Sequence, residues 1–513
     1  MAMANIEVDV CHNFGLELKS RCDQSEHIPS VEYHSPPINI LPTEILLHIF
    51  HFARYLWWRT PMTKDKVEGN PTWDRSIQDL MSLPYPEVLS HVCSLWRQIV
   101  LSSPSLWSHI DIYTMGRLNQ IPLSRSSAFL TRAQGHELSL RFIFCHNAHH
   151  SWSNLAATES FCSAVGPRLK SLQIENYAPD TTVFSSIFEA SLLHARPGVL
   201  TNLAIVEGTL RTGDDSEGLA GWMPPSLEQF GMTRHSLDNI LQSVQSLRLH
   251  SLSLPWTSPA YRGLIDLRLS FDYSYREYWP FIEAAQLREI LLACPGLRTF
   301  HSCIRISRQN SQVTLPPVPL NNLEMLNIRD LSLKFYEEFL PLIAPGDKPL
   351  TLVCRTHLRE EPIPYGPALQ AFFQRSKVTR LYITNRIPID YHEHFPLDQL
   401  FIHSPSTLHT LGLVRFKITE HIPYRDTCIN NLPSVQLECL SLRQCTIVPG
   451  VLRDMAMKFP AQILKLQDIP DEAQILEEIC SMFPVVKRVC PERSRIESWD
   501  TWGTDYDVNA SGT

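Results

Sequence analysis

The sequence has little of what catalytic proteins commonly display in their primary structure. It contains only 19 glycines against 38 prolines, so it is poor in the flexible turns that surround phosphates and nucleophiles. None of the signatures G-x-x-x-x-G-K-[ST], G-x-G-x-x-G and G-x-S-x-G occurs. The sequence therefore indicates no specific enzyme, and we expect the chain to lack catalytic residues.

Basic residues are in the minority. The chain has 45 lysines and arginines against 53 acidic residues, and its formal net charge is −8. This charge balance disfavours nucleic acid as a partner, and the sequence has no polybasic run that would bind an anionic membrane. No apolar run reaches the roughly 18 residues of a membrane span, and acids stand near the start where a secretory signal carries bases. We expect an intracellular protein, cytoplasmic, nuclear or both.

The 13 cysteines have an odd count and irregular spacing, which favours reduced thiols over a disulfide framework. Two segments, CHNAHH and DYHEH, concentrate donor atoms that bind metals: Cys145, His146, His149, His150, His392 and His394. Zinc requires about four ligands, and no C-x-x-C pair accompanies either segment. We therefore interpret these histidines as loop or surface residues and expect no metal and no cofactor.

A first helix is predicted after a polar lead, residues 1–37, that we expect to be disordered. In LPTEILLHIFHFARYL, Pro42 suits the first helical turn and Glu44 complements the helix dipole. The apolar stripe of this helix has helical spacing and consists of Ile45, Leu46, Ile49 and Phe50.

A second helix is predicted after a polar insertion at about residues 54–85. It opens at Pro86 and Glu87 and is stopped by SSPS, and Leu106 and Trp107 follow as a buried anchor. Its expected apolar face consists of Val88, Leu89, Val92, Cys93, Trp96, Ile99 and Val100.

These two segments together resemble the F-box, in the form common in fungal F-box proteins. The resemblance covers residues 38–112, within a predicted F-box domain over 38–113, and is carried by LPTEILLHIF followed by VCSLWRQIVLSSPSLW. It implies docking on the Skp-type adaptor of an SCF ubiquitin ligase, and through it on a cullin, by a helix-in-groove contact. The adaptor-binding residues that it implies are Leu41, Pro42, Ile45, Leu46, Ile49, Val92 and Trp96.

Other positions of the resemblance have different expected roles. Phe50, Cys93 and Trp107 are expected to hold the helices of the F-box together, and Arg97 either caps a helix end or pairs with an adaptor acid. The insertion departs from the compact family pattern. We expect the first helix to extend through RYLWW before a looped excursion, which would preserve the docking face.

Beyond residue 114 a strand-like pattern, L-x-x-L-x-L, recurs. It begins at Leu169, Leu200, Leu227, Val244, Leu264, Leu297, Leu323, Val378, Leu408, Leu437 and Ala461, with a degenerate unit in KPLTLVC. Most spacings are near those of leucine-rich repeats, and helix-like segments lie between the strands. We predict an α/β fold in which the small all-helical F-box precedes a leucine-rich-repeat-like solenoid over 114–495, with a flexible tail over 496–513.

Alternate strand positions of each unit should face away from the core, on the concave side. Six of these positions are basic, about twice the frequency of the whole chain: Arg248, Arg268, Arg329, Arg380, Arg443 and Lys465. Only Glu175 and Asp266 are acidic, and His301 and Tyr382 share the face. These bases are candidates for binding an acidic or phosphorylated target protein; solvated strand charges are the alternative.

The sequence as a whole favours a substrate-recognition subunit of an SCF-type ubiquitin ligase that performs no bond chemistry itself. Two other interpretations are open: a scaffold for protein–protein interaction outside a ligase, and an unrecognised enzyme in the region 114–495.

Overall fold

The structure is a computed structural model of the 513-residue chain. It describes residues 5–7, 37–58, 85–114, 120–144, 155–176, 181–207, 234–270, 281–307, 315–329, 331, 333–356, 367–385, 404–418, 437–447, 451–453, 460–469 and 482–488. The expectations for most of the lead 1–37, for most of the insertion 54–85 and for the tail 496–513 concern residues outside these ranges.

The first described part after the lead is helical. Its elements are η2 (Pro37–Ile40), α1 (Thr43–Trp58), α3 (Glu87–Ser90), α4 (Ser94–Leu101) and η4 (Pro104–Trp107). The first helix is confirmed, including its extension through RYLWW to Trp58. Helix α4 ends at Leu101, before SSPS, and Leu106 and Trp107 are fully buried as the anchor.

The prediction of one continuous second helix is wrong. The chain leaves helical geometry at Cys93, which has an extended backbone (φ −157°, ψ 173°) and begins a new helix. Its sulfur accepts a hydrogen bond from the backbone N–H of Trp96 at 3.5 Å, so Cys93 acts as an N-cap in place of the usual hydroxyl or carboxylate. The apolar spacing continues across the break, which is why the pattern alone concealed it.

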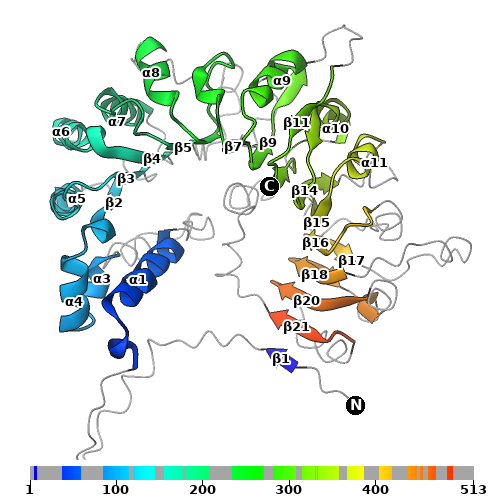
Figure 1. The fold of residues 1–513 in the computed structure, drawn as a ribbon, viewed down its shortest axis with the longest axis horizontal. Coiled ribbons are helices and arrows are strands. Elements are labelled where there is room, and N and C mark those ends of the chain that lie inside the picture. Colours follow the sequence, from blue (N-terminus) through cyan, green and yellow to red (C-terminus); the bar gives the residue numbers. More distant parts are fainter. Residues whose placement is uncertain are drawn as a thin grey trace, which may run out of the picture.

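The remainder of the described chain is a mixed α/β structure built on one parallel sheet (Figure 1). The fifteen described strands of this sheet run in the order β1-β21-β20-β18-β16-β15-β14-β12-β9-β7-β6-β5-β4-β3-β2. Their bounds, in chain order, are β1 (Asn5–Glu7), β2 (His109–Thr114), β3 (Leu138–Phe144), β4 (Leu169–Asn176), β5 (Asn202–Glu207), β6 (Ser246–His250), β7 (Asp266–Ser270), β9 (Thr299–Ser302), β12 (Met325–Asn327), β14 (Leu350–Thr356), β15 (Val378–Asn385), β16 (Thr410–Val414), β18 (Leu437–Arg443), β20 (Ala461–Gln467) and β21 (Val485–Arg488).

Helices cover the outer side of the curved sheet, and the strands line its inner side (Figure 1). These helices are α5 (Gln120–Arg132), α6 (Leu155–Val165), α7 (Thr181–Leu193), α8 (Arg234–Leu241), α9 (Ala284–Leu292), α10 (Leu333–Phe339) and α11 (Pro367–Gln374), with the short turns η6 (Gly166–Arg168), η9 (Pro259–Tyr261) and η11 (Leu340–Leu342). Three small parallel pairs accompany them: β8 (Phe281–Glu283) with β10 (Arg305–Ser307), β11 (Val318–Leu320) with β13 (Ile343–Pro345), and β17 (Lys417–Ile418) with β19 (Thr446–Ile447).

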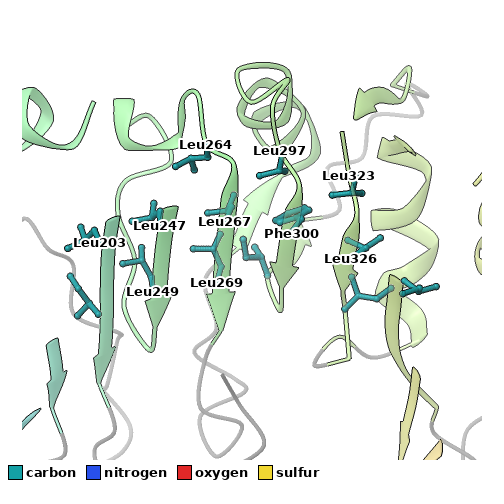
Figure 2. Packing of buried hydrophobic residues seen from close by; sticks show 14 of the residues in the cluster. Leu203, Leu247, Leu249, Leu264, Leu267, Leu269, Leu297, Phe300, Leu323 and Leu326 are labelled. Atoms are coloured by element: carbon teal, nitrogen blue, oxygen red, sulfur yellow. The ribbon is translucent and has the colours of Figure 1, made fainter. Parts of the chain in front are cut away.

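The core consists of leucine rows between the sheet and its helices. Strand register places Leu203, Leu247, Leu267, Phe300 and Leu326 side by side, and all five are buried (Figure 2). A side chain of this size stabilises the fold by about 1.5–3 kcal/mol when fully buried. The repeated leucines are therefore the main source of the sheet's stability.

The strands coincide with the repeated pattern of the sequence. Ten of the eleven L-x-x-L-x-L matches and the degenerate unit KPLTLVC lie on strands of this sheet, and the match at Leu227 falls outside the described residues. The repeated pattern does not include β2, β3 and β21, and β1 lies within the expected lead.

The N-terminal helices and the sheet share one continuous core. Trp107 packs edge-on against Phe129 of α5 with ring centroids 4.9 Å apart, and the Arg132 guanidinium lies over the Trp107 ring. Arg125 of α5 forms an ion pair with Glu87 of α3. The N-terminal helices therefore have no separate hydrophobic core, because residues of α5 and β2 belong to the same buried cluster.

Candidate functional site

Two surfaces of the described chain are candidates for binding other molecules. The first is formed by exposed apolar side chains of the N-terminal helices. Of the twelve large apolar side chains that are exposed in the described part of the chain, eight lie within residues 38–101. They are Ile38, Ile40, Ile45, Ile49, Phe52, Val92, Leu95 and Leu101. We call this set the N-terminal apolar surface.

Helix α1 has two apolar stripes, one buried and one exposed. Leu46 and Phe50 are buried at one stripe and lie against the core. Ile45, Ile49 and Phe52 form the other stripe at spacings of four and three residues, with exposed fractions of 45%, 37% and 62%. A surface helix of a globular protein buries one apolar stripe against its own core. The second, exposed stripe of α1 is therefore available to a partner.

Helix α4, which contacts α1, carries a second part of this surface, and Ile38 and Ile40 of η2 complete it. The two helices meet where the Phe50 and Trp96 rings lie 4.7 Å apart. Val92, just before α4, is 57% exposed, and Leu95 and Leu101 are exposed on the helix itself.

The residues implied as adaptor contacts divide into two groups. Pro42, Ile45, Ile49 and Val92 are exposed and can contact a partner. Leu46, in contrast, is 1% exposed, so its assignment to a docking face is corrected: its side chain is part of the chain's own core.

Leu41 and Trp96 are intermediate between these groups. Both are partly buried against the core, and Trp96 Nε1 donates a hydrogen bond to Asn39 Oδ1 at 3.2 Å. Either residue can offer only an edge of its side chain to a partner.

Contacts around the insertion hold the helices together on both sides of it. The Tyr85 hydroxyl donates to the Phe50 carbonyl, which joins α1 to the segment that precedes α3. Arg97 Nε donates to the Ser90 carbonyl at 2.9 Å and so caps the end of α3, the first of its two expected roles. The insertion therefore leaves α1 and α4 in contact.

The second candidate surface is the inner face of the sheet. We define it as the three alternate positions of each strand that point away from the leucine rows and their helices. Strand register places five of the six predicted basic residues there: Arg248, Arg268 and Lys465 in the middle row, Arg380 in the row nearer the amino ends, and Arg443 nearer the carboxyl ends. The sixth, Arg329, lies in a turn two residues after the end of β12, beyond the carboxyl end of that strand. His301 and Tyr382 also lie in the middle row, as predicted.

These bases differ in exposure. Arg380 is exposed, and Arg248, Arg443 and Lys465 are partly buried. Arg268 and Arg329 are buried, so neither is one of the solvated strand charges of the alternative interpretation, and neither presents an open guanidinium group to a target.

The first half of the inner face, from β2 to β9, has balanced charge. Its acids are Asp111, Glu175 and Asp266, and its bases are Arg141, Arg248 and Arg268. The balance includes direct ion pairs between these side chains. Arg141 Nη2 is 2.5 Å from Glu175 Oε1, Arg248 Nη2 is 2.8 Å from Asp266 Oδ2, and Arg268 Nε is 2.9 Å from Asp266 Oδ1.

Asp266 forms ion pairs with two arginines, Arg248 and Arg268. Burial alone would raise the pKa of its carboxyl group, but the charges of Arg248 and Arg268 and their hydrogen bonds outweigh burial and lower the pKa. One carboxylate thus neutralises part of the charge of two guanidinium groups.

The second half of the inner face, from β12 to β20, has an excess of positive charge. It holds five basic residues, Arg329 just beyond the end of β12 and Arg355, Arg380, Arg443 and Lys465 on strands, and none of its inner positions is acidic. In a chain with a net charge of −8, this region has the opposite sign to the whole. Lys487 of β21 continues the basic series but lies in register with Glu7 of β1.

An apolar cluster lies among these bases. Val353, Tyr382 and Val414 form a buried cluster separate from the main core, with Met325 packed against it. All four occupy inner positions of β12, β14, β15 and β16. We call this apolar cluster, together with the five basic residues Arg329, Arg355, Arg380, Arg443 and Lys465 around it, the inner-face site.

Sequence reasoning missed two bases of the inner face, Arg141 and Arg355. Arg141 lies on β3, where Leu138 aligns with the leading leucine of β4 but is followed by one residue instead of two before the next leucine, and Arg355 follows the degenerate unit KPLTLVC. The alternation of small or charged residues with leucine was the signal available for both. Sequence reasoning also missed the apolar cluster, because the register of neighbouring strands cannot be read from one sequence.

The described residues give no sign of a metal centre. Among them, no three His, Cys, Asp or Glu side chains lie together as potential metal ligands. The two histidine-rich segments, CHNAHH and DYHEH, fall outside the described ranges. Five cysteines in the described ranges, Cys93, Cys162, Cys294, Cys354 and Cys445, are free thiols.

Within the same ranges, no helix combines the length and the apolar character needed to cross a bilayer. Comparison with known proteins adds no family: no family model matches the chain, and no curated protein matches it significantly. The class defined by the fold is therefore a mixed α/β protein with a large, curved, parallel sheet and an N-terminal helical segment.

Proposed function

We propose that the chain is a substrate-recognition subunit of an SCF-type ubiquitin ligase. Residues 38–113 act as an F-box that docks on a Skp-type adaptor, and the sheet region acts as a leucine-rich-repeat-like solenoid that binds a target protein. The chain performs no bond chemistry, and it works inside the cell with the cullin that the adaptor recruits.

The N-terminal apolar surface is the observation that carries this proposal. A soluble chain gains nothing from exposing eight large apolar side chains within one short segment unless a partner covers them. Each such side chain contributes about 1.5–3 kcal/mol when it is fully buried. The stripe of Ile45, Ile49 and Phe52 suits a partner that receives one helix face in an apolar groove.

The other half of the proposal is supported by the parallel sheet and its repeated leucines. In stacked repeat units the inner face is long, continuous and free of covering helices, which suits binding an extended protein segment. The basic second half of this face favours a target segment that carries acidic or phosphorylated residues.

Co-purification with the adaptor tests the proposal. The native chain is expected to hold the host's Skp-type adaptor, and a variant with Ile45→Asp and Ile49→Asp is expected to lose it, because both substitutions place charge on the exposed stripe. The matched control is Leu193→Asp with Leu292→Asp, which changes two exposed apolar residues on α7 and α9. It should keep the adaptor.

Circular dichroism of all three chains establishes that the substitutions leave the fold intact. Failure of the native chain to hold the adaptor would overturn the proposal. Retention of the adaptor without any cullin would instead favour the scaffold outside a ligase.

A further inference from the structure

The inner-face site combines two chemical preferences. Val353 and Val414 are buried, so the apolar surface that remains at this site is that of the half-buried Met325 and the edge of the Tyr382 ring, which is 8% exposed. Arg380 is exposed, Arg443 is half-buried and Arg355 is buried, on the same or neighbouring strands. Adjacent strands are about 4.8 Å apart, so Arg355 on β14 and Arg443 on β18 are separated by about 14 Å. A segment that fits this site should carry bulky apolar side chains between acidic groups several residues apart.

Residues 496–513 of the chain itself have this composition. The stretch contains Glu497, Asp500, Asp505 and Asp507, and it has no lysine and no arginine. Trp499, Trp502 and Tyr506 alternate with these acids. Aromatic rings can pack on Met325 and the Tyr382 edge and also stack on guanidinium groups, while the carboxylates pair with the same bases.

The path of the chain allows this contact. All strands of the sheet are parallel, so Arg488 ends β21 at the same edge of the sheet at which Arg329, Arg355 and Arg443 lie. Residues 489–495 can span up to about 25 Å when extended. The five strand spacings from β21 to β14 amount to about 24 Å.

We propose that residues 496–513, which lie outside the described part of the chain, bind the inner-face site of the same chain. The segment is an internal ligand that any target of this face has to displace. A tethered ligand on a short linker has an effective concentration on the order of 1 mM, so it excludes weak competitors and admits strong ones.

The test uses the full chain and a fluorescent peptide with the sequence of residues 496–513. In one variant the tail acids are neutralised by Glu497→Gln, Asp500→Asn, Asp505→Asn and Asp507→Asn. The peptide is expected to bind this variant at least about tenfold more tightly than it binds the native chain, where the tethered segment competes. A peptide with the same four substitutions should bind neither chain.

Charge reversal locates the contact. Added to the tail-neutralised chain, Arg380→Glu with Lys465→Glu should weaken peptide binding at least tenfold, and both positions are exposed or half-buried, so folding should survive. The matched control is Arg262→Glu with Lys377→Glu, which reverses two exposed charges outside the inner face and should bind as before.

Three results would overturn the inference: no binding of the peptide to either chain, equal binding to both, or undiminished binding after the inner-face reversal. The experiment involves no adaptor, so its outcome is independent of the ligase proposal.

Discussion

The ring of Tyr382 lies directly over Gly412, its partner in the neighbouring strand, and leaves no room there for a methyl group. A Cβ atom at Gly412 would overlap Cδ1 and Cε1 of that ring. Gly412 therefore fixes the position of Tyr382, which in turn is part of the apolar cluster of the inner-face site.

We expect Gly412→Ala to lower the free energy of unfolding by about 1–3 kcal/mol, because the ring has to leave its place in a packed cluster. Urea denaturation measures the change. The control is Gly296→Ala, where the added methyl group meets no atom within 4 Å and the effect should stay within about 0.5 kcal/mol.

A second substitution identifies the cause. Combining Gly412→Ala with Tyr382→Val removes the ring and should cost less than the sum of the two single changes. Additive costs would show that the ring is not what excludes the methyl group.

Asp266→Asn should destabilise the chain by about 3–5 kcal/mol, because it leaves Arg248 and Arg268 in a largely buried place without their carboxylate. Thermal or urea unfolding measures this loss. The control is Glu324→Gln, which removes the exposed carboxylate that pairs with Arg298 and Lys348 and should cost less than about 1 kcal/mol.

The same carboxylate makes stability depend on pH. Its pKa is lower in the folded chain than in the unfolded chain, so its ionised form stabilises the fold at pH values above the unfolded-state pKa of about 4. This contribution is lost as the pH falls through the folded-state pKa. A plot of unfolding free energy against pH should therefore fall less steeply below pH 4 in Asp266→Asn than in the native chain; parallel curves would contradict the assignment.

The buried thiols should be inert in the folded chain. Burial raises the pKa of Cys354 and of Cys445 to about 12, and that of Cys162 to about 11. Since only the thiolate reacts, iodoacetamide at pH 8 should leave these three unmodified until the chain is unfolded in urea. Peptide mass spectrometry after timed alkylation measures this, and rapid modification in the native chain would contradict it.

The sequence predicted most of the elements but not their surfaces. Pro42 and the stripe of Ile45 to Phe50 located α1, because helical spacing is a local property. Helical spacing did not distinguish Leu46, which is buried, from Ile45, which is exposed. Two adjacent apolar stripes form one wide stripe in the sequence pattern, and only the folded structure shows which of them a neighbouring helix covers.

The sheet shows the same limit. Alternation within each unit correctly placed Arg248, Arg380 and Lys465 on the inner face. Which charges neutralise one another depends on strand register, and so the pairing of Asp266 with two arginines and the contact of Tyr382 with Gly412 could be seen only in three dimensions.

The order of the strands has a consequence for how the sheet assembles. From β2 to β21 each strand pairs with the next strand of the sheet along the chain, so these pairings close short loops and can form one after another. The pair of β1 with β21 is different, because it joins residues 5–7 to residues 485–487. Its three residues can add only to a β21 that is already in place, which makes β1 the last strand to join during folding and the first to detach when the chain is pulled from its ends.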